Sequence, residues 1–207
     1  FPRHKRAIYE TGTKVPFFVK LPQGKIKNID TNQLLSFVDL APTVLSIADI
    51  NIPSYMQGKP FMGKRIKNEP RNYLFTASDR FDENTDRIRA VRDNKFKYIR
   101  NYFPENSHAL DVDYRKQMVL MRHLTTLNLT GQLSEKQSLW FRVPKLREEL
   151  YDLENDPFEL NNLSLNDSFS SILEKYSKVL DDWIIEIDDL GRIPEQQLYK
   201  IISSVDD

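Results

Sequence analysis

The clearest pattern of apolar and polar positions lies near the C-terminus. Apolar residues recur there at the three- and four-residue spacing of one helix face: Phe169, Ile172, Leu173, Tyr176, Val179, Leu180, Trp183, Ile184 and Ile187. Asp167 is the expected cap at the start of this helix, and Gly191 is the expected residue at its end. The pattern therefore predicts an amphipathic helix at about 167–190 that lies on a sheet.

Short local patterns predict the strands of that sheet. Residues 73–78, Tyr-Leu-Phe-Thr-Ala-Ser, suit one strand, and residues 149–153 suit another because apolar and polar residues alternate there. Residues 87–102 suit two strands joined by a turn at Asp93 and Asn94, which predicts an antiparallel hairpin. We therefore expect a small α+β subdomain in which an antiparallel sheet is covered by the long helix.

Helical spacing returns between the hairpin and the last strand. Residues 114–129 place methionine and leucine residues on one helix face, and Gly131 is the expected end of that helix. Ser134 and Gln137 have the spacing of a capping box, which predicts a second, short helix.

The first third of the chain has a different pattern. Residues 13–21 form a β-branched and aromatic run that predicts a buried strand. Residues 36–48 predict a helix with Pro42 in its first turn and Asp39 as the cap. Residues 51–70, with three prolines and two glycines, predict an irregular connector.

Two domains are expected from this order of elements. Residues 1–70 would form the end of an α/β domain, and residues 71–207 would form the α+β subdomain.

Composition limits the class of protein. The chain has 207 residues, of which 40% are hydrophobic and 29% charged, so a packed core is expected. It has no cysteine, which excludes disulfides, thiolate nucleophiles and cysteine-based zinc sites. No apolar run approaches the roughly 18 residues of a membrane span. Because the chain starts at Phe1, without an initiator methionine or a signal peptide, we expect a piece of a longer polypeptide.

Charge is unevenly distributed although the net charge is zero. Residues 1–72 carry a net charge of +7, and residues 149–207 carry a net charge of −11. The acidic end is interpreted as a solvated surface. The basic end could attract an anion, and no nucleic-acid reader motif accompanies it. Its densest part is the run Arg3-His4-Lys5-Arg6, which needs either solvent or an anion.

Four segments in order along the chain resemble sulfatase motifs. They are the Lys-x-x-x-Tyr-Glu-x-Gly-x-x-Val-Pro string at 5–16, the Val-Asp-Leu-x-Pro-Thr string at 38–43, the glycine-marked segment at 58–61, and the Glu-Leu-Tyr-Asp-Leu…Asp-Pro segment at 149–163. The strings at 1–5 and from 79–83 to 98–102 look most like bacterial sulfatases related to heparan N-sulfatase. The chain is therefore similar to the C-terminal portion of a sulfatase.

The resemblance implies an alkaline-phosphatase-like α/β fold, a calcium ion and a formylglycine nucleophile. It implies hydrolysis of sulfate esters or sulfamates of carbohydrates, and a periplasmic or secreted location. No cysteine is present and no serine stands in the formylglycine motif, so the nucleophile and all metal ligands are expected outside this chain. The chain alone is then expected to be inactive and to need the N-terminal part of the same enzyme. A phosphonate or phosphodiester hydrolase of the same superfamily, or a module that binds sulfated glycans, remains an alternative.

The resemblance also assigns candidate site residues. Lys5 is the predicted catalytic residue, because a fixed ammonium would stabilise the charge that builds on the sulfuryl oxygens. The predicted substrate-binding residues are Arg3, His4, Arg80 and Asp82. Arg80 and Asp82 are expected in a loop, which is either a salt-bridged turn or a specificity loop.

Three further expectations concern neighbouring residues. Glu10 is expected to hold Lys5 or a nearby arginine, and Gly12 is expected to supply a backbone conformation. His108 and His123 have no partner at ligand spacing and are expected at the surface.

Overall fold

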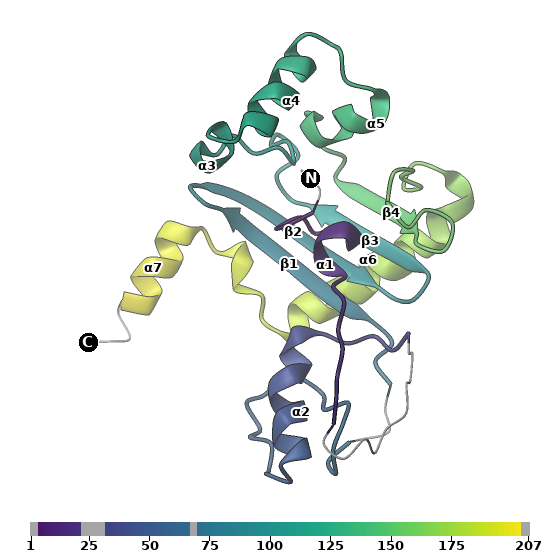
Figure 1. The fold of residues 1–207 in the computed structure, drawn as a ribbon, viewed down its shortest axis with the longest axis vertical. Coiled ribbons are helices and arrows are strands. Elements are labelled where there is room, and N and C mark those ends of the chain that lie inside the picture. The colour runs from purple at the N-terminus through teal and green to yellow at the C-terminus, as the bar shows by residue number, and fades with distance from the viewer. Residues whose placement is uncertain (1–3, 22–31, 67–69, 204–207) are drawn as a thin grey trace. The chain divides into compact units, whose positions relative to one another are not determined.

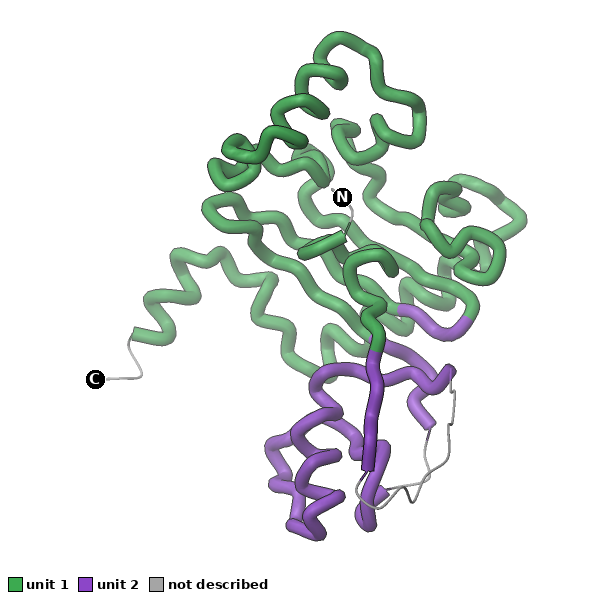
Figure 2. Tube along the Cα trace, in the orientation of Figure 1, with its two compact units in different colours: residues 1–16, 75–91, 95–207 green, residues 17–74, 92–94 purple. Residues whose placement is uncertain are grey.

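The computed structural model describes residues 4–21, 32–66 and 70–203. These residues divide into two compact units (Figure 2). Unit 1 contains the described parts of 1–16, 75–91 and 95–207, and unit 2 contains those of 17–74 and 92–94. The expected division into domains at residue 70 stays a prediction.

A four-stranded sheet forms the centre of unit 1, in the order β1-β2-β3-β4. The strands are β1 (Leu74–Phe81), β2 (Asn84–Arg92), β3 (Phe96–Asn101) and β4 (Glu148–Asp152). Two- and three-residue connections join the first three strands, and connections this short require antiparallel neighbours. β3 and β4 pair antiparallel, with Tyr98 opposite Leu150. The predicted antiparallel sheet and hairpin are thus confirmed.

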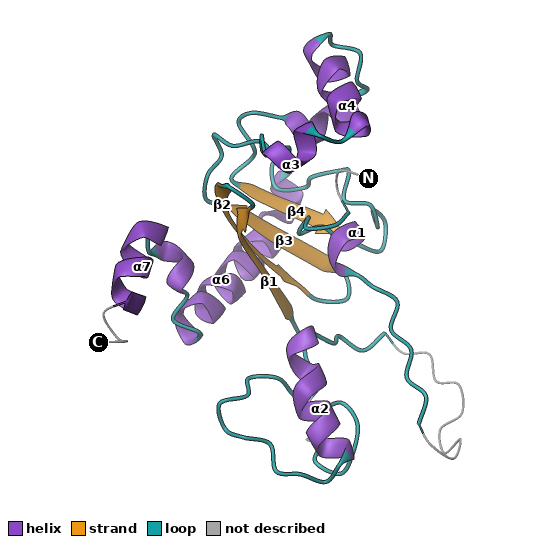
Figure 3. Cartoon of the chain, turned by 60° about the vertical axis from the view of Figure 1, so that its left-hand side comes forward, coloured by secondary structure: helices purple, strands orange, loops and turns teal. Residues whose placement is uncertain are grey.

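The long helix α6 (Ser170–Glu186) runs along one face of this sheet (Figures 1 and 3). Trp183 of α6 stacks on Phe75 of β1 with ring centroids 4.6 Å apart, and Tyr176 lies edge-on to Phe96 of β3. Tyr176 and Leu180 are buried by this packing. The predicted amphipathic helix is confirmed.

Both predicted caps of that helix are wrong. The Asn166 side chain, not that of Asp167, accepts the hydrogen bond of a backbone N–H, from Ser168, ahead of the helix. The helix ends at Glu186, and Asp188 adopts the left-handed conformation (φ 46°) that was expected of Gly191.

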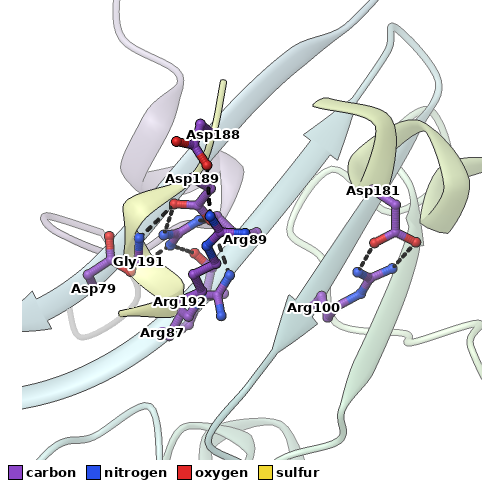
Figure 4. Close-up of polar contacts among 10 residues, drawn as sticks. Asp79, Arg87, Arg89, Arg100, Asp181, Asp188, Asp189, Gly191 and Arg192 are labelled. Atoms are coloured by element: carbon purple, nitrogen blue, oxygen red, sulfur yellow. Dashed lines mark hydrogen bonds and ion pairs between the residues drawn. The ribbon is translucent and has the colours of Figure 1, made fainter. Parts of the chain in front are cut away.

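Gly191 instead allows a close approach between side chains. A Cβ atom there would lie 2.0 Å from Nη2 of Arg89 and 2.8 Å from Oδ1 of Asp79. Arg89, which is 1% exposed, donates from Nε and Nη2 to the two carboxylate oxygens of Asp189, both at 2.9 Å (Figure 4). Nη1 of Arg89 lies 2.7 Å from Asp79. This buried ionic cluster ties the chain after α6 to strands β1 and β2.

The opposite face of the sheet is covered by the N-terminal segment. Side chains alternate along a strand, so Ile88 and Ala90 of β2 and Ile99 of β3 point away from α6. They form one buried cluster with Ile8 and Tyr9 and with residues further along the chain, Trp140 and Tyr151. Helix α1 (Glu10–Thr13) follows on the same face (Figure 1).

Short helices make up much of the rest of unit 1. They are α3 (Asp113–Lys116), α4 (Val119–Leu129), α5 (Glu135–Ser138) and α7 (Glu195–Ser203). The helix predicted at 114–129 is therefore broken into two, and α7 was not predicted. The capping box of Ser134 and Gln137 is confirmed, because each side chain bonds the other residue's backbone N–H. No helix among the described residues combines the length and the apolarity that a membrane span requires.

Unit 2 contains helix α2 (Leu40–Ile47) after a 3-10 turn at Phe37–Asp39. Asp39 stands at the N-cap position of α2, but its buried carboxylate accepts no N–H of that helix. It accepts the N–H of Ser36 at 2.9 Å instead, in a capping box with Ser36 at the start of the 3-10 turn, so the predicted cap acts one turn earlier. The carboxylate also accepts hydrogen bonds from the backbone N–H of Lys59 at 2.8 Å and from the Arg71 guanidinium at 2.5 Å. The described part of the connector is irregular, as predicted.

The strand predicted at 13–21 is wrong. Thr13 closes α1, and residues 14–21 are extended but pair with no strand among the described residues. Phe18 is 92% exposed there, and Val15, Phe17 and Val19 are about half exposed. A β-branched and aromatic run forms a strand only where a partner edge is present to take its hydrogen bonds.

Candidate functional site

The predicted catalytic residue lies in a tight turn at the start of the described chain. The N–H of Ala7 donates to the carbonyl of His4 at 3.0 Å, and Arg6 has a φ of 66°. Lys5 and His4 are exposed in this turn. Within the described residues, the Lys5 side chain has no hydrogen bond or ion pair. Its ammonium is therefore free to meet an anion, which is the property that the predicted role requires. Arg3 lies outside the described residues.

Gly12 holds this turn against α1. A Cβ atom on Gly12 would lie 2.2 Å from the carbonyl oxygens of both His4 and Ala7. Gly12 is thus required because the backbone of the turn approaches it closely. We expected Gly12 to supply a special backbone conformation, but its φ lies outside the left-handed region. Any side chain at this position would displace the turn that presents Lys5.

The tip of the β1–β2 hairpin meets the turn. Arg6 donates from Nη1 to the Asp82 carboxylate at 2.6 Å, and its guanidinium lies 4.5 Å from the Phe81 ring centroid. Arg80 donates to the carbonyl of Asp82 at 2.7 Å and forms an ion pair with Glu195 of α7. The expected loop is corrected: Arg80 lies on β1, and only Asp82 lies in a turn, with a φ of 49°. Asp82 is therefore paired with Arg6, the residue that follows Lys5, whereas Arg80 is paired with Glu195.

Two of the resembling segments meet at a buried lysine beneath this turn. Lys97 of β3, 1% exposed, donates from Nζ to the carbonyl of Ile8 at 2.6 Å. The same Nζ lies 3.3 Å from a carboxylate oxygen of Glu10 and 3.2 Å from one of Glu159. Lys97 therefore lies against Glu10, whereas Lys5 forms no ion pair with it among the described residues. The expected contact of Glu10 with a nearby arginine stays a prediction.

The backbone of Glu10 is also bonded directly to the carboxylate of Glu159. The N–H of Glu10 donates to Glu159 at 2.5 Å. Burial raises the pKa of Glu159, although the charge of Lys97 opposes the shift. A buried cation between two carboxylates fixes the N-terminal segment on the sheet.

A third buried carboxylate, that of Glu149 on β4, holds the N-terminal segment through Tyr9. Oε2 of Glu149 accepts hydrogen bonds from the hydroxyls of Tyr9 at 2.9 Å and Tyr151 at 2.6 Å, and Oε1 accepts one from Nδ2 of Asn101 at 2.6 Å. Nε2 of His108 lies 3.4 Å from the same Oε1. Burial alone would raise the pKa of Glu149, but the hydrogen bond and charge of His108, with the bonds from Tyr151 and Asn101, lower it to about 2.

His108 does not lie at the surface, where it was expected. Its side chain is only 10% exposed, 3.0 Å from the Tyr9 hydroxyl and stacked on Trp140. His123 is exposed, as expected. A cavity of about 240 Å³ beside Glu149 is lined in part by Tyr9, His108 and Trp140. It is smaller than the roughly 300–1,000 Å³ of usual small-molecule sites, and the oxygens of Glu149 are already bonded, so this cluster positions the turn.

We did not predict from the sequence patterns that Lys97 and Glu149 are buried, that the His108 side chain is only 10% exposed, or that Arg115 is half-buried. Lys97 and Glu149 stand at strand positions whose side chains face the same side as apolar neighbours, so the alternation of each strand held a signal for burial. His108 and Arg115 lie outside the strands and carried no such signal.

The described residues do not provide a metal site. They contain no group of three His, Asp, Glu or Cys side chains that could hold an ion. The described residues therefore do not include a ligand set that fits the calcium ion implied by the resemblance.

The chain matches known proteins over most of its length. The family model for the C-terminal region of N-sulphoglucosamine sulphohydrolase matches residues 3–137. An ulvan-active sulfatase of Formosa agariphila is 46% identical over 95% of this chain and 33% of its own length. A second ulvan-active sulfatase of that organism is 30% identical over 87% of this chain and 34% of its own. Human N-sulphoglucosamine sulphohydrolase is 26% identical over 91% of this chain and 40% of its own length. The chain thus spans about a third of the length of these relatives.

Proposed function

Because this chain belongs to the sulfatase family and matches the model for the C-terminal region of N-sulphoglucosamine sulphohydrolase, we propose that the whole protein removes sulfate groups from a carbohydrate by hydrolysis. Lys5 is proposed to contact the sulfate that is released. The observation that supports this role is the exposed Lys5 ammonium, which has no partner within the described residues while the residues behind it are fixed.

The chemistry of the proposed role follows from charge. As the bond between sulfur and the leaving oxygen or nitrogen breaks, negative charge grows on the oxygens of the sulfate. An ammonium held in place before the reaction stabilises that charge without having to reorganise. Gly12, Tyr9 and Glu10 hold the backbone around Lys5 through the contacts described above, so the chain supplies a positioned cation.

The other parts of the proposal come from the family resemblance. The formylglycine nucleophile and the calcium ion would be contributed by residues outside this chain. The substrate is proposed to be a sulfated polysaccharide, as supported by the names of the ulvan-active relatives. A periplasmic or secreted location belongs to the same proposal.

Turnover by a full-length protein that carries this region tests the proposed function. The protein would be incubated separately with ulvan, with heparin fragments and with a phosphodiester, and free sulfate or phosphate would be measured. We expect sulfate release from at least one sulfated carbohydrate. Phosphate release alone would favour a phosphodiester hydrolase, and binding of heparin without any turnover would favour a glycan-binding module.

A further inference from the structure

A second cation, Arg115, shares the Phe81 ring with Arg6, the residue after Lys5, and has no acidic partner in the described part of the chain. Arg115 of α3 places its guanidinium 4.1 Å from the Phe81 ring centroid and 5.3 Å from that of Trp140. Nη1 of Arg115 donates only two long hydrogen bonds, at 3.4 and 3.3 Å, to the carbonyls of His108 and Leu110. Within the described residues, Arg115 forms no ion pair.

The acidic residues nearby are already engaged. Asp111 and Asp113 lie 3.3 and 3.0 Å from the ammonium of Lys116. Glu83 accepts the N–H of Asp113 at 2.6 Å, and Asp82 is paired with Arg6. Two guanidinium groups, those of Arg6 and Arg115, therefore share the Phe81 ring, and among the described residues the Asp82 carboxylate pairs with Arg6 and not with Arg115.

Partial burial makes a guanidinium without an acidic partner unfavourable unless an anion offsets its charge. Arg115 is half-buried, and burial, with the charge of Arg6, lowers its pKa although the charge of Asp82 opposes the shift. Contact with aromatic rings offsets part of the desolvation of a guanidinium, but it does not neutralise the charge. A guanidinium whose hydrogen-bond donors lack strong acceptors is also well suited to bind a carboxylate or sulfate through two parallel bonds.

We propose that Arg115, beside Arg6 on the Phe81 ring, recognises a second anionic group of the saccharide whose sulfate meets Lys5. The inference rests on the proposed function for the identity of the ligand. Arg6 directly follows Lys5, and both Arg6 and Arg115 contact the same ring, so one ligand with two anionic groups can reach both positions. Arg115 is thus assigned to specificity and not to the chemical step.

The test is calorimetric titration of the full-length protein with a heparin tetrasaccharide at low and at physiological salt. Arg115→Gln is expected to weaken binding about tenfold at low salt, since it removes one charge-assisted contact, and to lower the salt dependence of the affinity. Arg115→Lys keeps the charge and should retain most of the salt dependence. Arg122→Gln on α4 removes an exposed charge with no described partner and is the matched control, which should bind as the wild type does.

Each outcome decides the inference. A purely structural role of Arg115 would lower the unfolding temperature of Arg115→Gln without changing the salt dependence of binding, and that result would overturn the proposal. Wild-type protein that fails to bind the tetrasaccharide would overturn it as well. Sulfate release is measured separately: turnover together with equal binding by Arg115→Gln rejects this inference and leaves the proposed function intact. Binding that depends on Arg115, without any sulfate release, rejects the proposed function and leaves the assignment of Arg115 to anion binding intact.

Discussion

Two charged regions of unit 1 differ in how completely their charges are paired. On the α6 side of the sheet, Arg89 is buried and faces the carboxylates of both Asp189 and Asp79 (Figure 4). On the other side, the turn that carries Lys5 exposes an ammonium without a partner among the described residues. Paired and buried charges fix the fold, whereas exposed and unpaired charges remain available to a ligand. Variants in the first region should therefore change stability, and variants in the second should change binding or turnover.

The largest effect on stability is expected for Asp189→Asn. This change leaves Arg89 buried without its bidentate partner, and breaking a buried ion pair costs about 3–5 kcal/mol of unfolding free energy. Asp188→Asn is the matched control in the adjacent position, because Asp188 is 76% exposed in its pair with Arg192 and should cost at most about 1 kcal/mol. Urea denaturation measures both variants. Equal losses in the two would contradict the distinction between buried and exposed pairs.

Acid should reduce the stabilisation that the buried carboxylates on both faces of the sheet contribute. The pKa values of Glu149 and Asp189 are each lowered to about 2, so the stability that they contribute is present above their ordinary pKa values and is lost as the pH falls towards 2. For Glu149 this loss is on the order of 3 kcal/mol.

A variant isolates that contribution, because Glu159, with its raised pKa, acts in the opposite direction. Glu149→Gln should be less stable than the wild type at pH 7, and its unfolding free energy should fall less between pH 5 and pH 2. An unchanged slope would show that Glu149 is not the group responsible. Denaturation at several pH values supplies the measurement.

The smallest of these stability effects is expected at Gly191. Gly191→Ala would place a methyl group 2.0 Å from the Arg89 guanidinium, and crowding of this kind costs about 1–3 kcal/mol. Gly131→Ala is the comparison: no atom lies within 4 Å of its added Cβ, so any loss there reflects only its φ of 65°. A loss for Gly191→Ala that persists when Arg89 is shortened to alanine would exclude the clash as the cause.

Local patterns predicted much of the fold because they reflect local physics. The spacing of apolar residues in α6 and the aromatic residues and alternation of β3 and β4 each indicate their element within a few neighbouring residues. The strand at 13–21 failed because pairing depends on a partner edge that the run itself does not specify. The predicted C-terminal cap of α6 failed because Gly191 is required for contact with Arg89, far away in sequence.

Only part of the candidate site could be predicted from the sequence, because its other residues meet through contacts far apart in the chain. The run around Lys5 was visible as a motif, and its exposure agrees with the role that was predicted. Its supports, Lys97, Glu159 and Glu149, lie 87 or more residues away from Tyr9 and Glu10 in the chain. Residue spacing carries no information on contacts at that separation, and the sheet alone brings these side chains together.

The turnover of a Lys5→Ala variant tests the central claim most directly. In a full-length protein, kcat is predicted to fall by at least about a hundredfold, since a positioned cation that stabilises developing charge is removed. The unfolding temperature is predicted to stay at the wild-type value, because Lys5 is exposed and has no partner among the described residues. A kcat close to that of the wild type, or a loss of activity accompanied by unfolding, would contradict the account.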